Sequence, residues 1–498
     1  MTKTSRHYHR LTAYDRHRMT PHPMNWAAQP RQFKSYSDLP AVTLPEISSL
    51  FPGEWDVVSS GSVTDDRPAP PDMEDLSRIF YLANGLTGRS RHQGGYFYYR
   101  SPPSAGALYP NELYLAWFGS DDLTAGLYHY EPHQRQLTRL RDGDFRAFMP
   151  EAEDSHGVFL ISGIFFRSAW KYRNRAYRYV LLDGGHLVES ARLALVAAGQ
   201  PGALFYDFDD HQINRLLGVD PDREVGLAGI RIGRGSAPSP LSISALDELP
   251  LRIAAASRVS ETETAYEEIA VAHRSGETVL PVPVDVPDIQ APDLGLAIDQ
   301  WRPFLFSFDP GNDPIRFGYA QAVIRRRSRR NFIPEPVSTG QFACLLEMIC
   351  RACLTGEQEV PAVSKTVQTG FLCWNVDDIR PGFYLLNPAS RQFGSVAAMD
   401  LIPSMTAACL NQEWLKNAAV HFLFMTNLDT IDRRLGPRGY RYAMMTAGRL
   451  GHAVYLAATA MGLGCCGIGA FYDNEAEQLL GLNGSSALLY LAAVGQIK

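Results

Sequence analysis

One internal repeat constrains the fold of this chain more than any other feature. When the 498-residue sequence is shifted by 263 positions, residues 175–218 overlie residues 438–481 without a gap, and fifteen positions are identical. Tyr177, for example, matches Tyr440. Two copies of roughly 180 residues are too few and too large for a solenoid. We therefore expect two copies of one α+β unit that pack as an intramolecular pseudo-dimer, as two identical subunits would.

Hydrophobic periodicity predicts the elements of the first copy. Residues 73–84 and 175–200 have the apolar spacing of helices. Apolar runs at 113–118, 125–130 and 158–166 have the length of strands, and polar turn residues separate them. The fold class that we predict is α+β, with an antiparallel sheet flanked by helices in each copy.

Changes in composition predict the domain boundaries. Residues 1–70 lack a sustained apolar period, which is typical of an arm that lies on a domain. Residues 236–312 contain Pro- and Ser-rich stretches, which predict a linker or wrapping segment. The two domains are therefore expected at 71–235 and 313–498.

Charge and cysteine usage exclude several classes of function. A net charge of -6 gives no basic field, so neither nucleic acid nor an anionic membrane is expected as a partner. The sequence has no apolar run of membrane-spanning length and no secretory signal, and this favours a cytoplasmic protein. All seven cysteines lie between Cys344 and Cys466, and their odd number favours free thiols. Cys350 and Cys353 have metal-ligand spacing but no second pair, so we predict no metal site.

Two stretches suit a flat, phosphate-bearing ligand. Residues 101–110 read Ser-Pro-Pro-Ser-Ala-Gly-Ala-Leu-Tyr-Pro, whose small residues let backbone N–H groups approach a planar group. Residues 325–332 read Arg-Arg-Arg-Ser-Arg-Arg-Asn-Phe, and guanidinium groups bind phosphate oxygens in bidentate fashion. A glycine-rich turn at 462–471 ends the repeated helix of the second copy.

These motifs together resemble the FMN-dependent nitroreductase superfamily, and residues 100–110 resemble its SagB/ThcOx-type dehydrogenase branch. The resemblance covers about residues 70–235 and 315–498. It implies that FMN binds where two copies meet, with the Arg-x-Ser-x-Arg segment and the glycine-rich turn from one copy and the Pro-Ser loop from the other. The residues that it implies for FMN binding are Arg326, Arg327, Ser328, Arg330, Gly464, Cys465 and Gly467 of the second copy and Ser104, Ala105 and Gly106 of the first.

The two copies depart from this pattern in complementary ways. Residues 58–66 contain no cation where the first copy should carry its phosphate cluster. Residues 360–367 keep only one proline where the second copy should carry its Pro-Ser loop. We therefore expect one composite FMN site and a decayed counterpart. Cys465 and Cys466 lie near it either as redox groups or as small buried apolar residues.

Lys171 and Tyr172 precede the repeated helix of the first copy, and the resemblance implies that they remove a substrate proton while the flavin takes hydride. A desolvated lysine can have its pKa lowered enough to act as a base. The equivalent residues of the second copy, Arg434 and Leu435, cannot do this. The alternative is an ordinary surface lysine beside a packing tyrosine.

Three functions follow from the resemblance. The first is a SagB-type dehydrogenase that oxidises a C–N bond, such as that of an azoline, in a peptide or carrier-bound intermediate. The second is a reductase that passes hydride from NAD(P)H to a nitro, quinone or enone acceptor. The third is a flavin-binding partner in a biosynthetic complex that does not turn over. A monomeric pseudo-dimer is expected in each case, and further assembly stays open.

Overall fold

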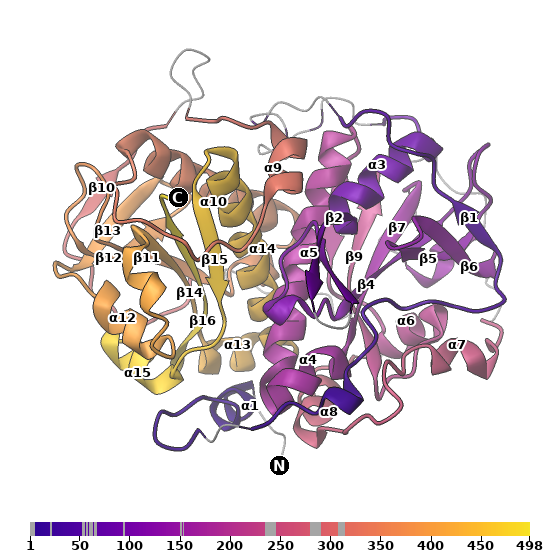
Figure 1. The fold of residues 1–498 in the computed structure, drawn as a ribbon, viewed down its shortest axis with the longest axis horizontal. Helices are drawn as coiled ribbons and strands as arrows, with labels where there is room; N and C mark the ends of the chain where they lie inside the picture. Colours follow the sequence, from indigo (N-terminus) through magenta and orange to yellow (C-terminus); the bar gives the residue numbers. More distant parts are fainter. Residues whose placement is uncertain are drawn as a thin grey trace. The chain divides into compact units, whose positions relative to one another are not determined.

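The computed structural model describes residues 5–19, 22–51, 55, 58, 63, 67–92, 95–149, 152, 154–234, 246–278, 290–306 and 314–498. The chain divides into two compact units (Figure 1). Unit 1 joins Met1–His22 and Glu54–Ser60 to Asp285–Lys498, and unit 2 comprises Pro23–Gly53 and Gly61–Val284. Unit 2 thus holds the first copy of the repeat and unit 1 the second.

Unit 2 is built on a seven-stranded antiparallel sheet of order β1-β6-β5-β4-β7-β9-β8. Its central strands are buried on both faces because helices and loops cover each side. The strands are β1 Ala41–Thr43, β4 Asn111–Trp117, β5 Gly126–Glu131, β6 Gln136–Asp142, β7 Gly157–Ile164, β8 Gly202–Phe205 and β9 Glu224–Ile232.

Unit 1 repeats this sheet strand for strand, in the order β10-β13-β12-β11-β14-β16-β15, and again every pairing is antiparallel. Its strands are β10 Trp301–Pro303, β11 Gln368–Cys373, β12 Gly382–Asn387, β13 Gln392–Ala397, β14 Val420–Asn427, β15 Gly464–Ile468 and β16 Ser486–Gly495.

A matching irregularity supports a common origin for the two sheets. The register of β7 against β9 shifts between Ile161 and Ser162. The register of β14 against β16 shifts between Phe424 and Met425, which are the same two positions moved by 263. A β-bulge at the same place in both copies is a feature of the fold rather than a local accident. The prediction of two α+β copies is confirmed.

Each unit has one long helix that packs on its sheet. In unit 2 this is α5, Ala176–Ala197, and in unit 1 it is α14, Arg438–Ala460. Nearly every residue of both helices is buried, which their many small residues permit. The other helices of unit 2 are α3 Met73–Asn84, α4 Phe165–Tyr172, α6 Asp210–Leu217, α7 Leu251–Ala255 and α8 Glu267–Arg274. Those of unit 1 are α1 Ser5–Leu11, α9 Tyr319–Arg325, α10 Thr339–Glu359, α11 Pro361–Ser364, α12 Ile402–Ala408, α13 Leu428–Leu435 and α15 Asp473–Leu479.

The N-terminal segment is tied to both units. In unit 1, the Tyr14 N–H donates to Asp473 Oδ2 at 2.8 Å, and the Arg10 guanidinium pairs with Glu477. In unit 2, the buried Lys34 ammonium lies 2.5 Å from Glu224 Oε2 and donates to Tyr114. A buried ion pair that is also hydrogen-bonded is costly to break, so it fixes this part of the segment.

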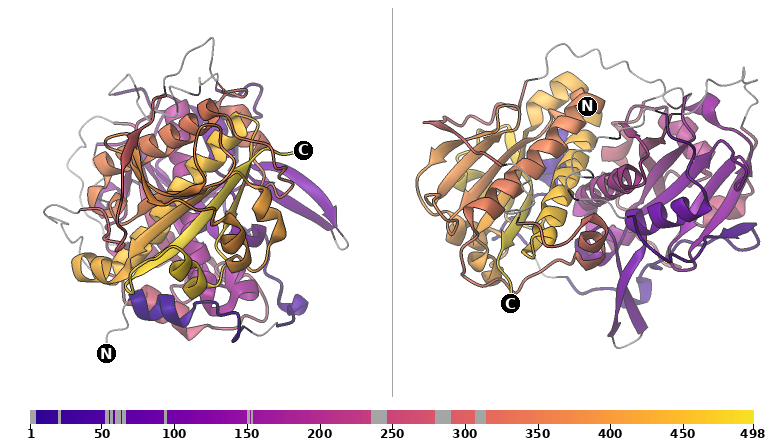
Figure 2. Two further views of the ribbon diagram at one scale, coloured as in Figure 1. Left: turned by 90° about the vertical axis from the view of Figure 1, so that its left-hand side faces the viewer. Right: turned by 90° about the horizontal axis from the view of Figure 1, so that it is seen from above.

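Two details differ from the sequence-based expectations. The apolar run 158–166 was predicted as one strand, but β7 ends at Ile164, and Phe165 and Phe166 begin α4. A hairpin of β2 (Leu86–His92) and β3 (Gly95–Arg100) was not predicted; it stands away from the sheet of unit 2 (Figure 2). In the described part of the chain, no helix combines the length and the apolar character that crossing a bilayer requires.

Candidate functional site

The residues predicted to act together lie in both units, and each part is built within its own unit. In unit 2, the loop between β3 and β4 contains a single 3-10 turn, Ala105–Ala107. Gly106 at its centre has φ +63, a left-handed conformation that glycine adopts without steric cost. Gly106 is also exposed, so this turn presents backbone at the surface.

A buried acid of the long helix holds this turn in place. Asp183 of α5 accepts a hydrogen bond from Ser104 Oγ at 2.6 Å and from the Ala105 N–H at 3.1 Å. Ser104 Oγ in turn accepts from the Tyr109 N–H at 2.8 Å, which closes the loop on itself. Burial raises the pKa of Asp183 to about 7, and the bonds from Ser104 and Ala105 oppose that rise.

The predicted catalytic pair lies directly against the same turn. A Cβ atom placed on Gly106 would come within 2.7 Å of Tyr172 Oη and 3.1 Å of Lys171 Nζ. The ammonium of Lys171 lies 5.4 Å from the centre of the Tyr172 ring. The fold therefore brings Gly106, Lys171 and Tyr172 together, and both side chains are half-buried.

In unit 1, the basic segment runs beside the edge strand of the sheet. Ser328 forms a parallel bridge with Cys465 of β15, and the Arg329 N–H donates to the Cys465 carbonyl at 2.9 Å. The pairing explains why the arginine-rich segment and the glycine-rich turn, which are more than 130 positions apart in the sequence, are neighbours here.

Tyr455 of α14 connects these two stretches. Its hydroxyl lies 2.9 Å from Ser328 Oγ and accepts a hydrogen bond from the Gly467 N–H at 2.6 Å. The guanidinium carbon of Arg326 lies 5.6 Å from the centre of the Tyr455 ring. Burial raises the pKa of Tyr455 well above its ordinary value, so the phenol stays protonated.

The arginines of the segment differ in their surroundings. Arg326 is buried, whereas Arg330 is exposed and lies 5.9 Å from the centre of the Trp414 ring. The Arg327 guanidinium donates to the backbone carbonyls of Ile324 and Arg326, which end and follow α9. Arg327 therefore caps a helix, while Ser328 and Arg330 remain exposed beside Arg326.

The donor set of residues 325–332 fits a phosphate group. It contains five guanidinium groups and one hydroxyl, and no carboxylate. Guanidinium and hydroxyl groups are the donors that proteins use for phosphate oxygens. Arg330 forms no ion pair within the part of the chain that the structure describes, which leaves its charge uncompensated by a carboxylate.

The two glycines predicted to approach the flavin ring have close neighbours inside unit 1. A Cβ on Gly467 would lie 1.7 Å from Tyr490 Oη, and one on Gly464 would lie 2.3 Å from Ile497. Packing alone therefore accounts for the absence of a side chain at both positions. Their contact with a flavin stays a prediction.

Cys465 and Cys466 are free thiols and both are buried. Burial raises the pKa of Cys465 well above its ordinary value, although the Arg326 charge opposes this. Burial also raises the pKa of Cys466, and the neighbouring Arg330 charge lowers it in part. A thiol that stays protonated is a poor nucleophile, which favours the packing role over the redox role.

Each copy also has a segment at the place where the other copy carries its predicted FMN-binding motif, and the structure describes these two segments only in part. Residues 58–66, where the first copy lacks cations, lie outside the described residues except for Val58 and Val63. Residues 360–367 of the second copy form α11 and the turn after it rather than an open loop.

The sequence analysis did not identify Asp183 or Tyr455 as functional residues. The repeat offered a signal for both, because shifting by 263 places Thr446 opposite Asp183 and Arg192 opposite Tyr455. At these two positions the two copies of the helix carry side chains of different chemistry.

Comparison with known proteins tests the predicted family. The model of the nitroreductase family matches residues 323–496. MJ1384, a nitroreductase-like protein of Methanocaldococcus jannaschii, is 29% identical over 164 residues, which cover 32% of this chain and 81% of that protein. The microcin B17-processing protein McbC of Escherichia coli is 26% identical over 133 residues, which cover 24% of this chain and about half (49%) of McbC.

A solved structure extends the comparison to the complete fold. The crystal structure of a nitroreductase-like protein from Anabaena variabilis superposes with a TM-score of 0.77, covers 100% of both chains and is 23% identical. A likeness at this identity establishes the fold. The prediction of two nitroreductase-like α+β halves in one chain is therefore confirmed.

Proposed function

This chain belongs to the nitroreductase family of oxidoreductases, and from that premise we propose that it is an FMN-dependent dehydrogenase of the SagB type. It would oxidise a C–N bond, such as that of an azoline, in a peptide or carrier-bound intermediate. The likeness to a protein named for processing microcin B17 supports this substrate class.

The observation that carries the proposal is the contact between the Lys171–Tyr172 pair and Gly106. A dehydrogenation of this kind needs a base beside the place where a planar cofactor and the substrate meet. The pair is half-buried, and the turn beside it exposes backbone at Gly106. Only the first copy has this arrangement, because the second has Arg434 and Leu435 instead.

We further propose that each chain binds one FMN. Arg326, Ser328 and Arg330 of unit 1 would hold the phosphate group, and the backbone at Ala105 and Gly106 of unit 2 would approach the ring. The sequence supports a single site, since the cationic segment exists only in the second copy and the Pro-Ser-Ala-Gly loop only in the first.

In the proposed reaction the substrate loses two electrons and two hydrogens. Lys171, as the neutral amine, would accept one hydrogen as a proton at Nζ. The Tyr172 hydroxyl would donate a hydrogen bond beside it and help carry the proton towards solvent. Bound FMN would supply the acceptor for the other hydrogen as hydride. Asp183 would act through the turn, by holding Ser104 and Ala105 in position.

A second candidate is an NAD(P)H-dependent reductase of nitro, quinone or enone compounds. The match with MJ1384 favours it, because that protein is nitroreductase-like and 81% of its length is covered. In this case the hydride would come from the nicotinamide, and Lys171 would not be needed as a base.

Stopped-flow absorbance separates the two candidates. The holoenzyme is mixed with NADPH, and bleaching of the flavin band is followed. We expect no rapid bleaching by NADPH and NADH but bleaching by an azoline-containing peptide. Rapid bleaching by either nicotinamide would contradict the dehydrogenase and support the reductase.

A further inference from the structure

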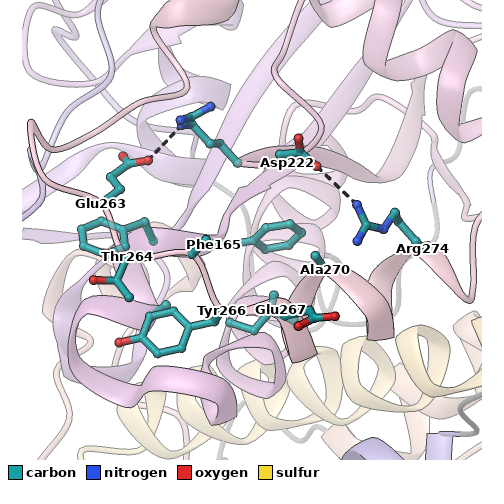
Figure 3. Close-up of a pocket in the computed structure, with 13 residues that line it drawn as sticks. Phe165, Asp222, Glu263, Thr264, Tyr266, Glu267, Ala270 and Arg274 are labelled. Atoms are coloured by element: carbon teal, nitrogen blue, oxygen red, sulfur yellow. Dashed lines mark hydrogen bonds and ion pairs between the residues drawn. The ribbon is translucent and has the colours of Figure 1, made fainter.

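A cavity of about 440 Å³ opens in unit 2, and its lining does not include the turn at Gly106 (Figure 3). Its walls come from three places in the chain: the first half of α4, the loop before β9, and the loop that leads into α8 together with α8 itself. Small-molecule pockets in proteins have volumes of this order. Neither the proposed dehydrogenation nor the phosphate cluster uses it.

One part of the lining is apolar and aromatic. The two rings of Phe165 and Phe166 are about 94% covered, so their remaining faces or edges line the cavity. Ala169, Ile269 and Ala270 add small aliphatic surface, and Tyr266 adds a third ring. Figure 3 shows Phe165 in the centre, with Tyr266 and Glu267 on one side of it and Asp222 on the other.

The charged groups of the lining leave an excess of negative charge. Arg223 Nε lies 3.0 Å from Glu263 Oε2, and Arg274 lies 3.4 Å from Asp222 Oδ1, so each arginine already faces a carboxylate. Glu267 is the third acid, and within the described residues its carboxylate has no hydrogen-bond or ion-pair partner.

Aromatic faces beside a carboxylate form a site for an organic cation. A ring attracts a cation through its quadrupole, and a carboxylate adds the opposite charge. An anionic ligand would have to displace Glu263 or Asp222 from an arginine, whereas a cation would meet a carboxylate that lacks a partner.

We propose that this cavity binds a protonated amine with an apolar, ring-sized body. The body packs on Phe165, Phe166 and Ile269, and the ammonium group lies towards Glu267. An amine-bearing small molecule and a basic side chain of a peptide share this chemistry. The inference stands apart from the proposed function, since none of its residues is assigned a part in the dehydrogenation.

The test is isothermal titration of the full-length protein with three probes that share a phenethyl group: phenethylamine, which is protonated at neutral pH, phenethyl alcohol, which is neutral, and 3-phenylpropionate, which is anionic. We expect the amine to bind at least about tenfold more tightly than the alcohol, and the carboxylate not to bind. Equal affinity for amine and alcohol, tighter binding of the carboxylate, or no binding of the amine would each overturn the proposal.

Variants locate the binding. Glu267→Gln removes the unpaired charge, and we expect the preference for the amine over the alcohol to fall to less than about threefold. Glu261→Gln is the matched control, because Glu261 is exposed on the same segment but does not line the cavity. Ala270→Leu fills the space and should abolish binding of both probes. Amine binding that survives Ala270→Leu would place the site elsewhere and contradict the proposal.

Discussion

The two long helices, α5 and α14, have the same place in two units of the same topology but hold different neighbours. Asp183 of α5 accepts hydrogen bonds from Ser104 and Ala105. At the equivalent position of α14, the Thr446 hydroxyl donates to the Val363 carbonyl at 3.2 Å. In unit 2 the side chain at this position binds the loop that follows α3 and the β2–β3 hairpin, and in unit 1 it binds α11, which follows α10. The residue is an acid in unit 2 and a threonine in unit 1.

The same contrast appears nine positions further along the two helices, at Arg192 of α5 and Tyr455 of α14. Tyr455 of α14 joins the basic segment to Gly467. At the equivalent position of α5, Arg192 pairs instead with Glu189 of the same helix at 2.6 Å. The copies keep the same backbone plan but differ in these side chains, and under the proposed function the loop and the base belong to unit 2 and the phosphate donors to unit 1.

The largest expected effect is on turnover and comes from removing the proposed base, Lys171. Lys171→Ala should lower turnover by about 10²-fold or more, because a positioned general base contributes roughly this factor. Bound FMN should stay at its wild-type level. Arg434→Ala, the matched change in unit 1, should leave turnover unchanged; a loss as large as that of Lys171→Ala would show that the units are not specialised in this way. Steady-state kinetics and the flavin absorbance of the purified variants give both readouts.

The next effect concerns the phosphate donors. Arg330→Ala should weaken FMN binding by roughly 10- to 100-fold, since a hydrogen bond to a charged group contributes about 1.5–3 kcal/mol. Arg325→Ala is the control from the same segment, because Arg325 is exposed and lies over Phe317. Flavin fluorescence on titration of the apoprotein measures both dissociation constants. If the two variants bind FMN equally well, Arg330 does not hold the phosphate.

A substitution of Gly106 tests the contact between this turn and the Lys171–Tyr172 pair. Gly106→Ala should reduce turnover about tenfold, because the new methyl group would displace Tyr172 and Lys171 by an amount that catalysis tolerates poorly. Gly199→Ala controls for backbone strain: Gly199 has φ +70, and nothing lies within 4 Å of its Cβ position. Similar losses of turnover in both variants would assign the effect to strain alone.

The smallest effect is a dependence of stability on pH. The pKa of Asp183 is raised from 3.8 to about 7 in the folded chain. Between those values the folded chain binds a proton that the unfolded chain has lost, so this group's stabilising contribution is complete below roughly pH 4 and is lost as the pH rises through about 7.

Asp183→Asn should therefore reduce the fall in thermal midpoint between pH 5 and pH 8, measured by scanning calorimetry. Thr446→Val, the matched variant of unit 1, should keep the wild-type dependence, because threonine does not titrate. An unchanged pH dependence in Asp183→Asn would mean that the carboxyl of Asp183 is ionised throughout this range.

Much of the fold could be predicted from the sequence because its signals are local or repeated. Residues 73–84 form the predicted helix because Asp72 caps its N-terminus and the apolar spacing continues to Asn84. The fifteen identities of the repeat predict two copies of one unit. The strand at 158–166 was predicted too long because the change from β7 to α4 is set by pairing with β9 and not by local composition.

The roles of Asp183 and Tyr455 could not be predicted in the same way. Asp183 meets Ser104 across 79 positions, and Tyr455 meets Ser328 across 127. Such contacts exist only once the sheet has brought distant segments together, so the repeat marks these two positions as different between the copies but does not identify their partners. Lys171 and Tyr172 were identified by resemblance, and their proximity to Gly106 came from the structure.

The central claim is that the two copies share one flavin, and the ratio of FMN to chain tests it most directly. The purified protein is saturated with FMN and freed of excess, and the flavin released on denaturation is measured against the protein concentration. The account predicts about one FMN for each chain, falling towards zero in a chain that carries both Arg326→Ala and Arg330→Ala. Two FMN for each chain would show that the first copy kept its own phosphate site. If no FMN were bound, the proposal that this chain is a flavoprotein would be wrong.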